Sequence, residues 1–142
     1  MNAPIQNASI PHNAPIQKAS ISAGRLWSAR ILSTLLILFL LFDGITKVVR
    51  ESHVVEAFNR LGIPVSRAPG IGVLVLVCAL VYAVPRTAVL GAILITGLLG
   101  GAVATHVRAG SPAFEAFVFP VMMGALTWLP LWLRDTRVRA LL

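Results

Sequence analysis

The chain carries four long apolar segments, and short polar stretches separate them. The segments cover about residues 26–49, 69–84, 87–107 and 114–133. The third begins with 19 uncharged residues. As a helix these would extend about 28 Å, close to the ~30 Å hydrocarbon core of a bilayer. Because helices satisfy their own backbone hydrogen bonds in lipid, the pattern predicts an all-α integral membrane four-helix bundle.

The link between the first two spans, residues 51–61, has a helical pattern of its own. Its polar residues lie largely off the face that holds its apolar ones. The apolar face consists of Val54, Val55, Phe58 and Leu61. This pattern predicts a short amphipathic helix between spans 1 and 2, which lies on the membrane surface or caps the bundle.

Three charged residues close the first span. Asp43, Lys47 and Glu51 are spaced i, i+4 and i+8, so we expect a ladder on one helical face with acid before base. An unpaired Asp at membrane depth costs about 2.5–3.5 kcal/mol on insertion scales, so a partner is expected. Two interpretations stay open: Lys47 neutralises Asp43 and locks the helix end, or both belong to a polar pocket.

Antiparallel connectivity gathers polar groups at one end of the bundle. Four spans place both termini on one side and the chemistry-bearing residues on the other. The polar-pocket candidates are Asp43, Lys47, His106, Arg108 and Glu115. An acid–imidazole pair beside an apolar cavity is typical of a proton relay or a headgroup site. The alternative is an ordinary hydrated loop region with salt bridges. No metal site is predicted, and the chain has no CxxC pair or dinucleotide-binding glycine loop.

The third span carries a stripe of small residues. Gly97, Gly101 and Thr105 repeat every four residues and so share one helical face. Small residues let helix backbones approach closely in lipid. We therefore predict that this stripe is a helix-packing surface.

Composition supports the membrane prediction. Hydrophobic residues make up 57% of the chain and charged residues 12%, about half the soluble norm of roughly 25%. The net charge of +7 is spread over the ends of apolar segments, which is typical of membrane flanks and excludes a nucleic-acid partner. Seven basic residues lie on the side of the termini and five on the other, so we expect cytoplasmic termini.

Residues 1–23 form a separate polar tail. NAPIQNASI at 2–10 recurs as NAPIQKASI at 13–21, a duplication with a period of 11 residues. Two proline-containing copies are too few for a solenoid, so a disordered tail is predicted. The membrane domain then covers 24–142.

Several segments resemble the DoxX-like family, a branch of the DoxX/DoxD group of small membrane proteins. They are FDGITKVV, FNRLGIP, IGVLVLV and VPRTAVLGAILITGLLGGAVATHVRAG, and the likeness covers about residues 31–139. The resemblance implies a four-helix membrane bundle in a bacterial cytoplasmic (inner) membrane. Asp43 and Lys47 match the polar positions that close the family's first helix, and His106 and Arg108 match the end of the third. One position departs, because Val75 stands where such proteins often carry glutamate.

The resemblance also implies a link to quinone or sulfur redox chemistry, since DoxD-type subunits belong to a thiosulfate:quinone oxidoreductase. The leading hypothesis is a membrane subunit of a redox system, with a redox partner subunit and with quinone bound near Asp43, Lys47, His106 and Arg108. Whether the chain is itself an enzyme stays open. The alternatives are a non-catalytic bundle that anchors a partner or a second copy in the lipid bilayer, and a small-molecule permeability factor.

Overall fold

The computed structural model describes residues 23–134 and 138, and the described chain is helical between short links. The tail with the duplication lies outside these residues, apart from Ala23, which begins the first helix. The α-helices are α1 (Ala23–Val49), α2 (Ser52–Arg60), α3 (Ala68–Ala83), α4 (Ala88–Arg108) and α5 (Phe119–Arg134). A 3₁₀ turn, η1 (Val65–Arg67), leads into α3, and a π-helical turn, η2 (Phe114–Val118), leads into α5.

Four helical stretches in the described chain are long and apolar enough to cross a membrane. They are α1, η1 with α3 (Val65–Ala83), α4, and η2 with α5 (Phe114–Arg134). The prediction of a four-span, all-α membrane bundle is confirmed. The short helix between spans 1 and 2 is confirmed as α2. Its predicted apolar face is turned inward: Phe58 is buried and Val54, Val55 and Leu61 are half-buried.

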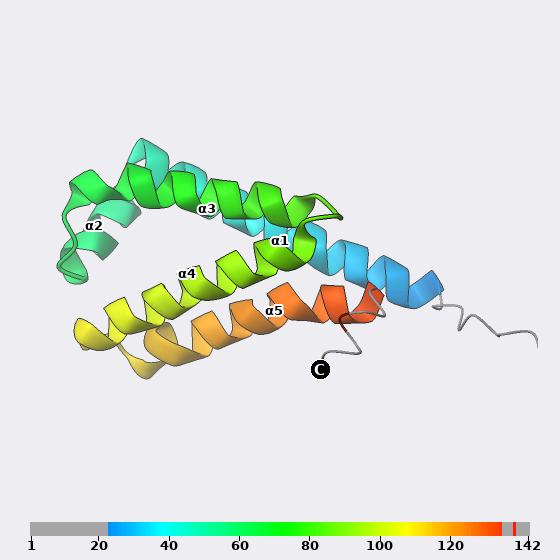
Figure 1. The fold of residues 1–142 in the computed structure, drawn as a ribbon. Helices are drawn as coiled ribbons and strands as arrows, with labels where there is room; N and C mark the ends of the chain where they lie inside the picture. The colour runs from blue at the N-terminus through cyan, green and yellow to red at the C-terminus, as the bar shows by residue number, and fades with distance from the viewer. Residues whose placement is uncertain (1–22, 135–137, 139–142) are drawn as a thin grey trace, which may run out of the picture.

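The helices form two layers that meet at one end (Figure 1). α1 and α3 lie side by side in one layer, and α4 and α5 lie in the other. The layers join at the end that contains the α3–α4 turn and separate toward the end that contains α2 (Figure 1). The buried core includes Leu36, Val75, Tyr82, Ile95 and Leu131, so all four spanning helices contribute to it.

Glycines set the closest contacts between helices. A Cβ built on Gly91 would lie 2.4 Å from the Cα of Tyr82, and one on Gly72 would lie 2.7 Å from the carbonyl oxygen of Gly44. In contrast, a Cβ on Gly97 or Gly101 would meet no described atom within 4 Å. Small residues do allow close approach, but the two glycines of the predicted stripe on α4 make no such contact with the described residues. Its role as a packing surface toward another chain stays a prediction.

Two prolines shape the last span. Pro120 has no N–H to donate to the carbonyl one turn before it, and the preceding η2 is wound as a π-helix in which the N–H of Phe119 donates to the carbonyl of Phe114. Pro130 likewise leaves the carbonyl of Leu126 without its helical donor, and the hydroxyl of Tyr82 donates to the next carbonyl, that of Thr127, at 2.9 Å. A neighbouring helix thus supplies a hydrogen bond where proline weakens the helix.

The glycine contacts predict opposite effects for two matched substitutions. Gly91→Ala places a methyl group against the backbone of α3, so we expect a loss of about 1–3 kcal/mol in the free energy of unfolding. Gly97→Ala meets open space and adds helix propensity, so we expect a gain of up to about 1 kcal/mol. Thermal unfolding in detergent can be followed by the reactivity of Cys78, which is buried and is the only cysteine of the chain. Equal effects of the two substitutions would contradict this packing.

Candidate functional site

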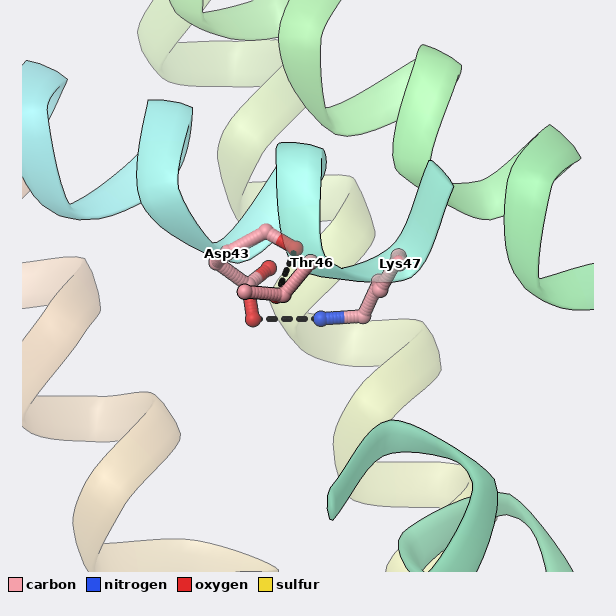
Figure 2. A network of polar contacts seen from close by, with 3 residues as sticks. All are labelled: Asp43, Thr46 and Lys47. Carbon is pink, nitrogen blue, oxygen red and sulfur yellow. Dashed lines mark hydrogen bonds and ion pairs between the residues drawn. The ribbon is translucent and has the colours of Figure 1, made fainter. Parts of the chain in front are cut away.

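The last two turns of α1 hold an ion pair. The ammonium group of Lys47 donates a hydrogen bond to the carboxylate of Asp43 (Figure 2). The Lys47 and Asp43 side chains are 19% and 33% exposed. The hydroxyl of Thr46, which lies between them in sequence, donates to the backbone carbonyl of Asp43 at 3.0 Å. Asp43 therefore has the partner that is expected for a carboxylate near the end of an apolar helix.

The prediction that Glu51 lies on the same helical face as Asp43 and Lys47 is wrong. α1 ends at Val49, and Arg50 has a positive φ of 55°, which turns the chain away from the helical face. Glu51 instead caps α2, and its carboxylate accepts hydrogen bonds from the N–H of His53 at 3.0 Å and the hydroxyl of Ser52 at 2.8 Å. The Ser52 hydrogen bond is the main cause that lowers the pKa of Glu51 below its ordinary value of 4.5.

A cleft of about 510 Å³ lies between the end of α1 and α2. Its apolar walls come from both helices. Two carboxylates, an ammonium group and an imidazole also line it. It is lined by Phe42, Asp43, Thr46, Lys47, Glu51, His53, Val54, Ala57 and Phe58. Because the backbone reverses at Arg50, the first turn of α2 lies opposite the last turns of α1. The cleft combines charged groups with an apolar floor at the edge of a membrane span.

A second polar group lies at the turn between α4 and η2. The Nδ1 atom of His106 is 3.0 Å from the hydroxyl of Ser111 and 3.8 Å from the carboxylate of Glu115. The N–H of Ser111 also donates to the carbonyl of His106 at 3.0 Å. Gly110, with φ of 66°, provides the left-handed turn that brings these residues together. This group holds the end of α4 to the start of the last span.

Four of the five predicted polar-pocket residues fall into two groups, and Arg108 belongs to neither. Asp43 and Lys47 line the cleft, whereas His106 and Glu115 pair at the α4–η2 turn. Within residues 23–134 and 138, no hydrogen bond or ion pair joins the two groups, and none involves the side chain of Arg108. Over the same residues, no three His, Cys, Asp or Glu side chains gather as a metal site.

Three polar residues that line the cleft are not among the predicted polar-pocket residues: Thr46, Glu51 and His53. The signal for His53 was its position two residues after the acid that starts α2, which places it on the first turn beside the end of α1. Val75, the position where glutamate was expected from the resemblance, is 5% exposed in the apolar core. The helical core at that position holds an aliphatic side chain in place of a carboxylate.

Comparison with known proteins identifies one family. The model of the DoxX-like family matches residues 31–129, which extend from the first half of α1 to near the end of α5. No curated protein and no solved structure matches the chain. The matched range contains both polar groups.

The Asp43–Lys47 pair predicts non-additive effects on stability. Asp43→Asn alone leaves the ammonium group of Lys47 without a partner, and Lys47→Met alone leaves the carboxylate of Asp43 without one. We expect each single variant to lose about 1 kcal/mol or more in the free energy of unfolding, and the double variant to lose less than the sum. The free energy of unfolding is measured in mixed detergent micelles for the wild type, the two single variants and the double variant. Strictly additive losses would show that the two charges act independently.

Proposed function

The chain belongs to the DoxX-like family, and from this premise we propose that it is the membrane subunit of a quinone-linked redox system. In this proposal the cleft between α1 and α2 holds the quinone ring. The electrons come from a partner subunit that oxidises a sulfur compound or another small donor. The observation that carries the proposal is the combination, in one cleft at a membrane edge, of apolar walls with hydrogen-bond donors.

The residues of the cleft fit such a ligand. Its volume of about 510 Å³ is within the range of small-molecule sites. Phe42, Val54 and Phe58 offer apolar surface to a ring and an isoprenoid chain. Lys47 and His53 carry the N–H groups that bind carbonyl oxygens. When bound, a quinone supplies a two-electron acceptor.

Each polar residue then has a distinct role. Asp43 holds the ammonium group of Lys47 in place, so that this donor is oriented before the ligand arrives. The imidazole of His53 can give or take a proton at the ring oxygen, and it faces the cleft from the turn capped by Glu51. The capping bond fixes the start of α2 and thereby the distance of His53 from α1.

A second candidate function is a non-catalytic anchor for a partner chain. It is favoured by the small-residue stripe on α4, where Gly97 and Gly101 are exposed and an added Cβ would meet no described atom within 4 Å. In lipid such a face allows close approach of a helix from another chain. This function needs neither the cleft nor its histidine.

Affinity purification of the full-length protein in mild detergent tests the quinone proposal. Mass spectrometry of extracted lipids is expected to find a quinone near one per chain. His53→Ala removes a donor from the cleft and is expected to lower quinone retention about tenfold, since a hydrogen bond to the ligand contributes about 1.4 kcal/mol. His106→Ala removes an imidazole outside the cleft and is the matched control, with retention unchanged.

Two results would contradict the proposal. A preparation without quinone would exclude it, and loss of quinone in His106→Ala but not in His53→Ala would place the ligand at the other polar group. Co-purifying proteins decide between the candidates in the same experiment. A partner that is lost in Gly101→Leu and kept in His53→Ala, in the absence of quinone, would establish the anchor.

A further inference from the structure

The opposite end of α1 carries an open groove of about 240 Å³. The groove lies along one face of the helix, because its residues are spaced i, i+3, i+4, i+7 and i+8. It is lined by Trp27, Arg30, Ile31, Thr34 and Leu35. An indole and a guanidinium stand at its outer end, and aliphatic side chains continue toward the middle of the span.

The guanidinium of Arg30 lacks an acid partner within the described chain. Arg30 is exposed, and the ion pairs among residues 23–134 and 138 join Asp43 to Lys47 and His106 to Glu115. A nearby arginine is engaged differently, since the guanidinium of Arg25 lies 6.0 Å from the ring centre of Trp132 on α5. Arg30 therefore offers its five N–H groups to whatever occupies the groove.

This end of the bundle has an excess of positive charge. The beginning of α1, the α3–α4 turn and the end of α5 lie at this end (Figure 1). Among the described residues it holds four arginines and no carboxylate, whereas the other end has five cations and four carboxylates. The four arginines are Arg25, Arg30, Arg86 and Arg134.

We propose that the groove binds an anionic phospholipid, independently of the quinone proposal. The phosphate group pairs with the guanidinium of Arg30, which matches a phosphate with two parallel hydrogen bonds. One acyl chain lies along Ile31 and Leu35, which are 52% and 58% exposed in the span. Trp27 is at the level where indole rings prefer the membrane–water interface. Charge complementarity and the direction of the groove, from the interface into hydrocarbon, favour a lipid over a second protein chain.

Native mass spectrometry tests the proposal on the full-length protein. The protein is reconstituted in micelles with equal amounts of phosphatidylglycerol and phosphatidylcholine. We expect the wild-type chain to retain a bound phosphatidylglycerol about tenfold more than phosphatidylcholine, as a charge-assisted bidentate contact provides. Arg30→Gln is expected to abolish most of this preference. Arg86→Gln removes an equal charge at the same end of the bundle but outside the groove. This variant is expected to keep the preference for phosphatidylglycerol.

Three outcomes would overturn the proposal. The wild-type protein could show no preference, or the two arginine variants could lose it equally, which would indicate a general field and no site. A dimer signal without lipid that disappears in Leu35→Ala would identify a second copy as the occupant. As a control, the midpoint of thermal unfolding of Arg30→Gln in phosphatidylcholine alone is expected to match that of the wild type. A match shows that the variant has lost lipid binding and not its fold.

Discussion

The close approach of α1 and α3 at Gly44 and Gly72 is the contact on which the polar end of the bundle depends. A Cβ on Gly72 would lie 2.7 Å from the carbonyl oxygen of Gly44 and 2.9 Å from the Cβ of Lys47. The stem of Lys47 thus rests against the backbone of α3, and its ammonium group turns back to Asp43. Apolar side chains alone do not draw helices together in lipid, so this backbone contact fixes the site.

The two ends of the bundle have different packing and different chemistry. At the end with the α3–α4 turn, Gly91 and the buried Ala79, Ala88 and Ala92 let the layers meet, and the core forms there. At the other end the layers separate and polar groups collect on α1, on α2 and at the α4–η2 turn (Figure 1). Binding sites are generally found where packing is least complete, because a ligand needs space and mobility.

Much of the fold could be predicted from the sequence, because the bilayer sets the length of each span and amphipathic spacing identifies α2. The residues that particular side chains contact could not be predicted from the sequence. Small-residue spacing shows where a close approach is allowed, but the neighbour is decided by tertiary packing, so Gly44, Gly72 and Gly91 pack while Gly97 and Gly101 do not. Connectivity places His106 at the polar end, but it could not show that the turn at Arg50 puts His53 in the cleft, or that His106 pairs with Ser111 and Glu115 instead.

We expect the last turns of α1 to face water in the cleft rather than lipid. Labelling of Thr46→Cys with a charged maleimide, in proteoliposomes and in a Cys78→Ala background, tests it most directly. Thr46→Cys is expected to react nearly as fast as Ser52→Cys on α2, whereas Leu38→Cys, exposed in the middle of the same span, is expected not to react. If Thr46→Cys is as unreactive as Leu38→Cys, the last turns of α1 face lipid.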